Sequence, residues 1–304
     1  MNSVAIRLAA LALFGLGCTA KAANLVGSEP CRACHPDLWS KFNRNAHFRT
    51  YPATHGEPVP NTGCEGCHGP GGDHVKHPSK TSIFAFSTHT PQEAAERCLT
   101  CHAEDLSRAN VRRSEHTRAG VNCLSCHSIH SSAPETRLLV SDQRSLCYGC
   151  HPSVRAQFSM PFKHRVNEGF MSCTDCHNPH GTFAPTWRMA NRPHMVDQRL
   201  LNEEACLGCH VDKRGPFVFE HTSVRVDGCE TCHQPHGSPN PRMLNRPVVF
   251  TVCLECHNGS GSGRTGLGEP VPVSFHNLAD PRFHNCIGCH VRIHGSNADP
   301  YLLR

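Results

Sequence analysis

Residues 206–236 read CLGCHVDKRGPFVFEHTSVRVDGCETCHQPH, and the pattern in this stretch recurs along the whole chain. Two Cys-x-x-Cys-His motifs flank His221, and His236 follows three residues after the second motif. The motif occurs ten times in 304 residues and uses all but one of the 21 cysteines. The ten motifs are Cys31/Cys34/His35, Cys64/Cys67/His68, Cys98/Cys101/His102, Cys123/Cys126/His127, Cys147/Cys150/His151, Cys173/Cys176/His177, Cys206/Cys209/His210, Cys229/Cys232/His233, Cys253/Cys256/His257 and Cys286/Cys289/His290.

Cys-x-x-Cys-His is the attachment signature of c-type haem. The two thiols form thioethers with the porphyrin vinyl groups, and the adjacent imidazole becomes the proximal iron ligand. Structural zinc combines Cys-x-x-Cys pairs two at a time and does not require His at the next position. A disulfide framework does not require that His either. The sequence therefore predicts ten covalently bound c-type haems.

The first 22 residues have the organisation of a secretory signal peptide. A lone Arg7 precedes the apolar run Leu8–Gly17, and Ala20-Lys21-Ala22 supplies a small-x-small cleavage site. The remaining cysteine, Cys18, is removed if cleavage follows Ala22; the alternative is a lipidated cysteine, which the preceding Gly17 fits poorly. We expect a mature chain of residues 23–304 that is exported from the cytoplasm, which in a bacterium means to the periplasm.

Composition indicates a fold organised by haem rather than by a protein core. The chain contains 24 Gly and 23 Pro, only 6% of its residues are aromatic, and no apolar periodicity is sustained. Such a polypeptide alone buries too little apolar surface to offset its chain entropy. We expect a multihaem cytochrome c fold with short α-helices, long irregular segments and almost no β-structure, arranged as an elongated chain of haems.

The remaining histidines indicate the second axial ligands. Ten proximal histidines leave 15 of the 25, whereas the whole chain has six Met. Bis-histidine ligation throughout is therefore the economical interpretation, and it gives six-coordinate, low-spin iron. The predicted second ligands are His47, His74, His116, His130, His164, His180, His221, His236, His276 and His294.

These histidines define five two-haem modules, approximately residues 31–74, 98–130, 147–180, 206–236 and 253–294. In the last module His276 and His284 are both possible ligands, and the sequence leaves that choice open. Histidines outside the scheme are expected to have surface or propionate-contacting roles; they are His55, His77, His89, His194 and one of His276 and His284.

A histidine three residues after a proximal ligand has restricted reach. If the segment is helical, His180 lies on the same face as His177, about 5–6 Å away between Cβ atoms. It cannot easily reach the far side of the same porphyrin. We therefore expect His130, His180 and His236 to ligate a neighbouring haem, although sequence alone does not assign each second ligand to its iron.

Several local sequences resemble the MtrA/DmsE-type periplasmic decahaem cytochromes over essentially the whole mature chain. The matching segments are CEGCHGPG at 64–71, CTDCHNPHG at 173–181, KRGP at 213–216 with CETCHQPHGS at 229–238, and CIGCHVRIHGSN at 286–297. Two departures stand out: residues 258–285 show no clear family ligand, and Ala298 occupies a position where the family commonly has His.

The resemblance implies a position partly inside an outer-membrane β-barrel porin. There the protein would pass electrons between a periplasmic or inner-membrane cytochrome and an extracellular multihaem cytochrome, mineral or soluble acceptor, such as iron or another metal. The direction of flow, the terminal donor or acceptor and the reduction potentials are not evident from the sequence.

Other classes of protein are less consistent with the sequence. A multihaem reductase needs an iron with an open distal position, but the histidine candidates outnumber the irons, so we expect no enzyme activity. A periplasmic electron shuttle without a porin remains the main alternative. The net charge of +5 comes without a basic cluster, so no nucleic-acid partner is expected.

The haem count is directly testable. We expect the intact mass of the exported protein to equal a chain beginning near Ala23 plus ten haems, because ten complete motifs follow a signal peptide that contains the extra cysteine. Mass spectrometry of fully matured material measures this. Nine haems or fewer, or a lipid on Cys18, would contradict the prediction.

Overall fold

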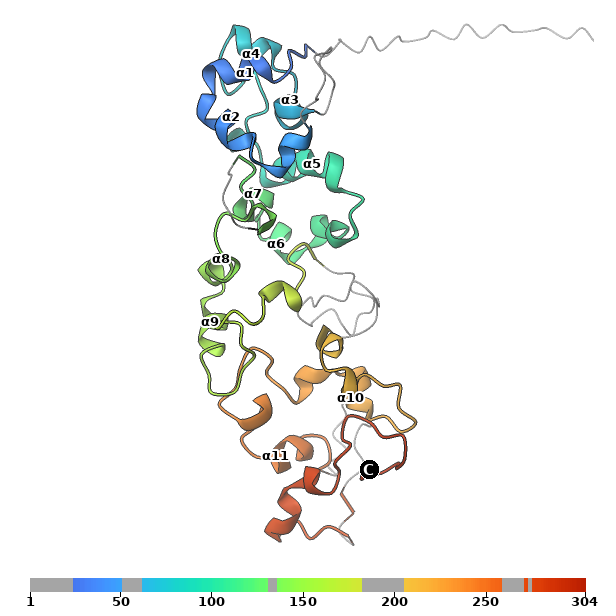
Figure 1. The fold of residues 1–304 in the computed structure, drawn as a ribbon. Coiled ribbons are helices and arrows are strands. Elements are labelled where there is room, and N and C mark those ends of the chain that lie inside the picture. Colours follow the sequence, from blue (N-terminus) through green and yellow to red (C-terminus); the bar gives the residue numbers. More distant parts are fainter. Residues whose placement is uncertain (1–23, 51–61, 131–135, 182–204, 259–270, 273–274) are drawn as a thin grey trace, which may run out of the picture. The chain divides into compact units, whose positions relative to one another are not determined.

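The computed structural model describes residues 24–50, 62–130, 136–181, 205–258, 271–272 and 275–304 (Figure 1). The predicted signal peptide, His55 and His194 lie outside these ranges. The chain divides into two compact units, Met1–Thr88 and His89–Arg304. The first unit contains the first two Cys-x-x-Cys-His motifs, and the second contains the other eight.

Short helices account for most of the regular structure in both units. The longest α-helix, α5, has 12 residues. The α-helices are α1 (Glu29–Cys34), α2 (Pro36–Phe42), α3 (Gly63–His68), α4 (Gly72–Lys76), α5 (Pro91–His102), α6 (Glu115–Arg118), α7 (Cys123–Cys126), α8 (Gln143–Cys150), α9 (Pro152–Gln157), α10 (Thr222–Val226) and α11 (Val249–Leu254).

Single turns of 3-10 helix alternate with the α-helices. They are η1 (Ala46–Thr50), η2 (Phe86–Thr88), η3 (Leu106–Arg108), η4 (Val111–Arg113), η5 (Thr136–Leu138), η6 (Cys173–Asp175), η8 (Ala205–Gly208), η9 (Val211–Lys213), η10 (Cys229–Thr231), η11 (Pro241–Met243), η12 (Pro281–His284) and η13 (Cys286–Gly288).

Helical turns form at the Cys-x-x-Cys-His motifs. In several of them the histidine N–H donates to the carbonyl of the first cysteine, as from His127 to Cys123 at 2.8 Å and from His151 to Cys147 at 2.9 Å. One helical turn places residues i, i+3 and i+4 on the same face. Both thiols and the imidazole of a motif are thereby presented to one side, which is the arrangement that one porphyrin requires.

Extended structure is limited to isolated antiparallel bridges in the described part of the chain. These bridges are His127↔Leu139, Phe162↔Ser238, Phe219↔Ser296 and His233↔Leu244. The prediction of short helices and irregular segments with almost no β-structure is therefore confirmed. None of the described helices is long and apolar enough to cross a membrane.

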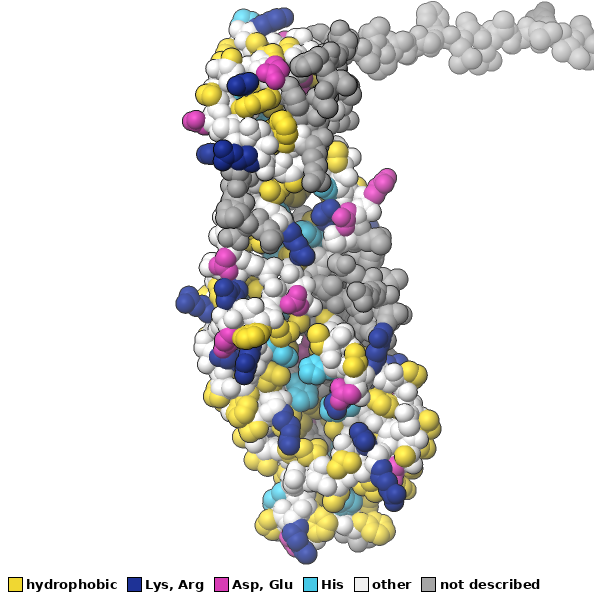
Figure 2. All heavy atoms as spheres, viewed as in Figure 1, with side chains coloured by type: hydrophobic (Ala, Val, Ile, Leu, Met, Phe, Trp, Pro, Cys, Tyr) yellow, Lys and Arg dark blue, Asp and Glu magenta, His cyan; other side chains and the backbone are white. Residues whose placement is uncertain are grey.

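The protein core is small. The hydrophobic residues buried in the described segments are Phe42, Ala94, Leu99, Phe158, Val166 and Leu302. Other large side chains, including Phe170 and Tyr301, are more than 70% exposed. In Figure 2 hydrophobic side chains are spread over the visible face, with histidines among them. The polypeptide alone thus provides little apolar burial to stabilise the fold.

A buried carboxylate organises the first unit. Glu65, in α3, is 6% exposed and accepts hydrogen bonds from the backbone N–H groups of Val26, Gly27 and Gly71. Its oxygens lie 3.0, 2.8 and 2.7 Å from these three nitrogens. Charge-assisted bonds of this kind are stronger than neutral ones. Glu65 therefore links residues 26–27, through hydrogen bonds, to the turn at Gly71 that follows the second motif.

We expect Glu65→Ala to loosen residues 24–28, because it leaves three partly buried N–H groups without their acceptor. A local cost of about 3 kcal/mol corresponds to amide hydrogen exchange about 100-fold faster in that segment. Hydrogen–deuterium exchange of the haem-loaded chain measures it. The control is Asp73→Ala, which removes only an exposed 3.3 Å contact with Asn24 and should change exchange by less than about threefold. Equal effects of the two substitutions would contradict this role.

Candidate functional site

In the part of the chain that the structure describes, eight proximal histidines are seen to face a second histidine. The ring centroids of each pair lie between 5.8 and 6.3 Å apart. The pairs are His35–His74, His116–His151, His127–His180, His164–His210, His177–His236, His221–His257, His233–His294 and His276–His290. The remaining proximal histidines are His68 and His102, and the remaining predicted ligands are His47 and His130.

These separations fit two imidazoles on one iron. A metal–imidazole bond is about 2 Å long and the nitrogen lies about 1.1 Å from the ring centre, so coaxial rings have centroids about 6.2 Å apart. That is too far for ring stacking in van der Waals contact. In the tightest pair, the Nε2 atoms of His177 and His236 lie 3.5 Å apart, close to the roughly 4 Å that a metal needs between them. Two axial nitrogens leave four equatorial positions for a porphyrin.

The pairs join successive modules. The histidine between the two motifs of one module faces the first motif of the next, as His164 faces His210. The histidine after the second motif faces the second motif of the preceding module, as His236 faces His177. At the two ends of the chain, His35–His74 and His276–His290 close within their own modules. The structure thus arranges the histidines in a crossed pattern.

Backbone carbonyls orient many of these imidazoles through Nδ1. The proximal histidines His127, His233 and His290 donate from Nδ1 to the carbonyls of Arg137, Arg242 and Tyr301, at 2.9, 2.9 and 2.6 Å. Among the second ligands, His116 and His164 contact the carbonyls of Pro179 and Pro235 at 2.9 and 2.7 Å. A carbonyl at Nδ1 fixes the tautomer, leaves Nε2 for the metal and increases the basicity of the ligand.

The carbonyls that hold His127 and His233 come from left-handed turns. Arg137 and Leu138 have φ values of 62° and 59°, and Arg242 and Met243 have 57° and 56°. Such conformations cost about 1–2 kcal/mol for a residue other than glycine. These turns were not predicted from the sequence. The signal available was a repeated Arg-Leu-Leu or Arg-Met-Leu about ten residues after a proximal histidine.

Burial keeps several second ligands neutral. Desolvation, reinforced by nearby cationic and imidazole groups, lowers the pKa of His180 and of His294 to about 4. The pKa values of His221 and His236 are lowered for the same primary reason. Neutral imidazole is the form that binds a metal, so these side chains are ready to coordinate at neutral pH.

The attachment cysteines of neighbouring motifs lie close together. Cys31 and Cys64 are in side-chain contact, which raises the pKa of Cys31 and lowers that of Cys64 to about 6. These thiol protons are lost once the thioethers form, but the sulfur atoms of neighbouring motifs stay close together. Within modules the contacts are Cys31–Cys64, Cys98–Cys123, Cys147–Cys173 and Cys253–Cys286; between modules, the nearby pairs are Cys126–Cys150, Cys176–Cys206 and Cys232–Cys256.

The second cysteines of the motifs differ in exposure, although the sequence analysis treated all of them alike. In the first four modules the second cysteine of the first motif is exposed, whereas that of the second motif is half-buried. The exposed cysteines are Cys34, Cys101, Cys150 and Cys209, and the half-buried ones are Cys67, Cys126, Cys176 and Cys232. The last module departs from this pattern, because Cys256 and Cys289 are both exposed.

The order of the modules accounts for this difference in part. Three of the half-buried cysteines, Cys126, Cys176 and Cys232, lie near cysteines of the following module. Cys289 belongs to the last motif of this sequence and is exposed. Exposure alone does not identify a thioether. The attachment of haem through all twenty motif cysteines, with Cys67, Cys101, Cys209 and Cys289 among them, therefore stays a prediction from the motif.

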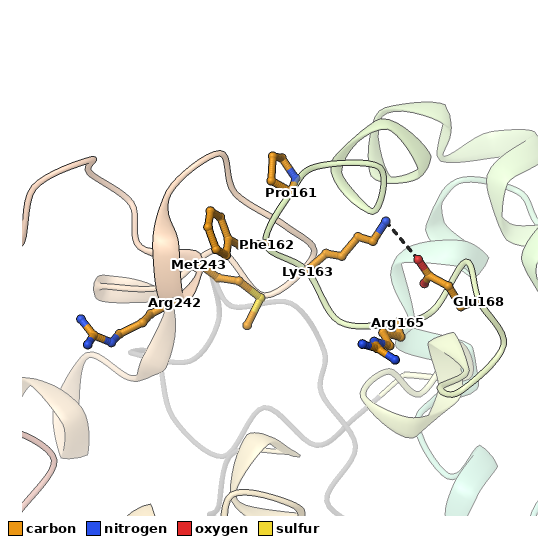
Figure 3. A pocket seen from close by; sticks show the side chains of 7 residues that line it. All are labelled: Pro161, Phe162, Lys163, Arg165, Glu168, Arg242 and Met243. Carbon is orange, nitrogen blue, oxygen red and sulfur yellow. Dashed lines mark ion pairs between the residues drawn. The ribbon is translucent and has the colours of Figure 1, made fainter.

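An open cavity of about 510 Å³ is lined by cationic side chains, including the two residues that flank His164 in the sequence (Figure 3). Lys163, Arg165 and Arg242 line it, and Lys163 also pairs with Glu168 at 3.0 Å. Phe162 and Met243 supply an apolar part of the wall. A haem edge combines an apolar ring with two anionic propionates, so this mixture of residues fits the group that the histidine pairs require.

Comparison with known proteins agrees with this geometry. A family model described as a doubled CXXCH motif matches residues 116–156 and 221–262, and one described as cytochrome c554 and c-prime matches residues 73–128. The chain is therefore a multihaem c-type cytochrome with covalently bound haem c.

A more specific relationship follows from whole-chain similarity. The chain is 32% identical over 288 residues to the multihaem cytochrome MtrA of Shewanella baltica, covering 89% of this chain and 79% of that protein. It belongs to the MtrA family of electron-transfer cytochromes, as its local sequences predicted.

Other similarities are more distant. The high-molecular-weight cytochrome c of Nitratidesulfovibrio vulgaris is 23% identical over 217 residues, covering 61% of this chain and 35% of that protein. An undecahaem cytochrome from the S-layer of Carboxydothermus ferrireducens is 18% identical with a TM-score of 0.22, covering 51% of this chain and 32% of that chain.

The structure distinguishes the two candidates of the last module. The ring of His276 lies 6.2 Å from that of His290. His284 instead contacts the Leu278 carbonyl through Nε2 at 2.9 Å and packs 4.4 Å from the ring of Phe250. A carbonyl contact at Nε2 occupies the nitrogen that would bind iron.

We therefore expect His276→Ala to create one high-spin haem and His284→Ala to create none, because only His276 faces a proximal imidazole. Ferric electron paramagnetic resonance of the fully haem-loaded variants counts the high-spin centres. His77→Ala, at an exposed histidine, serves as a second control. A high-spin signal from His284→Ala, or none from His276→Ala, would show that the assignment is wrong.

Proposed function

We propose that the chain is a ten-haem electron relay in which every iron has two histidine ligands. The cysteines of the ten motifs attach the haems, and the adjacent histidines are the proximal ligands. The eight facing histidines seen here, together with His47 and His130, supply the second ligands. When bound, each haem supplies an iron that alternates between the ferric and ferrous states.

The observation that carries this proposal is the contact between cysteines of consecutive motifs. Because the thioethers anchor each porphyrin at its vinyl edge, touching cysteines hold neighbouring haem edges near each other. Cys147 contacts Cys173, and Cys126 lies near Cys150, so both the separations within modules and those between them are short. Electrons hop efficiently only between near-touching cofactors, so this spacing supports a continuous path.

The ligand arrangement also favours transfer over catalysis. A second imidazole occupies the coordination position that a substrate would need, and carbonyl contacts at Nδ1 hold imidazoles such as His116 and His164 in place. The ligands need not move during an electron transfer. Such a site accepts and releases electrons without binding the donor or acceptor to iron.

We further propose that the protein is periplasmic and crosses the outer membrane within a β-barrel porin. Membership of the MtrA family supports this proposal, as do the signal-like residues 1–22. The partners would be a periplasmic or inner-membrane cytochrome on one side and an extracellular multihaem cytochrome, mineral or soluble acceptor on the other. Iron or another metal is the proposed terminal donor or acceptor.

Reconstitution tests the conduit. Liposomes containing an internal redox dye and an external reductant are prepared with the cytochrome and a candidate barrel together, and with each protein alone. We expect dye reduction only with both proteins, because the described helices offer no membrane span and the barrel provides the passage.

Dye reduction by the cytochrome without a barrel would contradict this requirement. If the cytochrome reduces soluble acceptors but forms no complex with any barrel, its function is that of a periplasmic shuttle. If all haems of the cytochrome are low-spin, the proposed electron relay stands whichever of these outcomes is found.

A further inference from the structure

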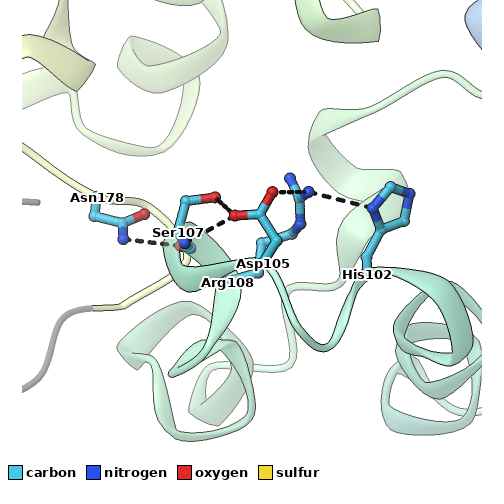
Figure 4. Close-up of polar contacts among 5 residues, drawn as sticks. All are labelled: His102, Asp105, Ser107, Arg108 and Asn178. Atoms are coloured by element: carbon cyan, nitrogen blue, oxygen red, sulfur yellow. Dashed lines mark hydrogen bonds and ion pairs between the residues drawn. The ribbon is translucent and has the colours of Figure 1, made fainter.

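One proximal histidine has a cation at Nδ1. The Arg108 guanidinium nitrogen Nη2 lies 3.2 Å from Nδ1 of His102 (Figure 4). At His127 and His233 the atom facing Nδ1 is instead a carbonyl oxygen, 2.9 Å away in both cases. The motif of His102 therefore has a positive charge beside Nδ1, whereas the motifs of His127 and His233 have the negative end of a carbonyl dipole there.

The guanidinium is held in position by its own loop. Nη2 of Arg108 also donates to Asp105 Oδ2 at 2.5 Å, and Asp105 Oδ1 accepts from the backbone and hydroxyl of Ser107 at 2.8 and 2.6 Å. Asn178 donates to the Ser107 carbonyl at 2.9 Å, which ties the loop to the segment before His180. Figure 4 shows the resulting row of side chains from Asn178 to His102.

Asp105 neutralises the arginine only in part. It contacts one end of the guanidinium, whereas the buried Nε of Arg108 has no hydrogen-bond partner among the described residues. Asp105 is also the more exposed member, with 43% of its side chain accessible against 30% for Arg108. The pair is therefore a dipole whose positive end faces His102.

The two kinds of neighbour act oppositely on an iron ligand. A carbonyl at Nδ1 makes the imidazole more basic and stabilises ferric iron. Guanidinium is always charged and carries only donors. An imidazole bound to iron through Nε2 keeps its proton on Nδ1, so no hydrogen bond joins it to Arg108, and the arginine acts through its charge, which opposes the additional positive charge of the ferric state. The ferrous state, with one positive charge fewer, is disfavoured less.

We propose that Arg108 raises the reduction potential of the haem ligated by His102, and that Asp105 limits the size of this increase. The inference rests on the proposed relay. In the step concerned, a neighbouring ferrous haem gives one electron to the ferric haem at His102; the donor becomes ferric and the acceptor ferrous, and no proton or covalent bond is exchanged. Arg108 favours the acceptor side of this exchange and makes the third haem a local electron store.

Optical redox titration of the full ten-haem chain tests the proposal with Arg108→Gln. A unit charge at this range changes a one-electron equilibrium by about tenfold, equivalent to 59 mV. We expect the ferrous-to-ferric ratio of one haem to fall by about that factor. When the titration curve of the variant is subtracted from that of the unsubstituted protein, the absorbance difference would then peak at about half of one haem's redox absorbance change. That is about 5% of the absorbance change of all ten haems.

Three further variants separate charge from structure. Asp105→Asn should shift one haem in the opposite direction, because it leaves Arg108 unneutralised while its Oδ1 can still accept from Ser107. Arg108→Lys should retain part of the effect. Arg112→Gln is the matched control, since Arg112 pairs with Glu96 at 2.7 Å and is about half exposed; it should shift nothing.

An unchanged titration in Arg108→Gln, or shifts of the same sign in Arg108→Gln and Asp105→Asn, would overturn the proposal. If Arg108→Gln fails to take up ten haems, the test rests on Asp105→Asn alone. If Asp105→Asn then does not raise the reduction potential of one haem, the result counts against the proposal. Ferric spectra of each variant report the spin state separately, so a failure of tuning in fully low-spin protein leaves the relay standing. High-spin iron in the unsubstituted protein would count against the relay itself.

Discussion

The crossed pairing of imidazoles is the interaction on which the rest of this structure depends. The modules at 147–180 and 206–236 each give one histidine to the module before and one to the module after, as His180 faces His127 and His164 faces His210. In the proposed relay a shared iron would make each such pair a strong cross-link between segments far apart in sequence. Because a metal site binds the folded chain and not the unfolded one, ligand binding and folding would be coupled. The same bonds would then determine both the fold and the spacing of the redox centres.

A fold held together by ligand bonds needs only a small protein core. Buried apolar residues such as Leu99 and Val166 are few, and the helical turns at the motifs are too short to be stable alone. Their stability comes instead from the covalent attachment and from the ligands. Local hydrogen-bond networks supplement it where the chain must be held at a particular place, as the Glu65 carboxylate does in the first unit.

Sequence predicts those parts of this arrangement that depend on the spacing of residues along the chain. The attachment motifs, the helical turns that bear them and the regular second histidines all follow from local patterns. The choice between His276 and His284 does not, because both lie within reach of the last motif and only the folded chain shows which one faces His290. The left-handed turn at Arg137 does not follow from residue propensity either, since neither arginine nor leucine favours that conformation, and only the recurrence of Arg-Leu-Leu as Arg-Met-Leu marks it. Non-local contacts determine both outcomes.

A relay built from repeated ligand sets faces a physical constraint of its own. If every iron has two imidazoles and similar carbonyl contacts, the local ligands give every haem nearly the same potential. Differences along the path must then come from departures in the surroundings, of which a charged side chain beside a ligand is among the strongest. Arg108 is such a departure, and its partner Asp105 restricts the effect to a short range. The ligand pattern thus provides continuity, while isolated charges beside it determine where electrons reside.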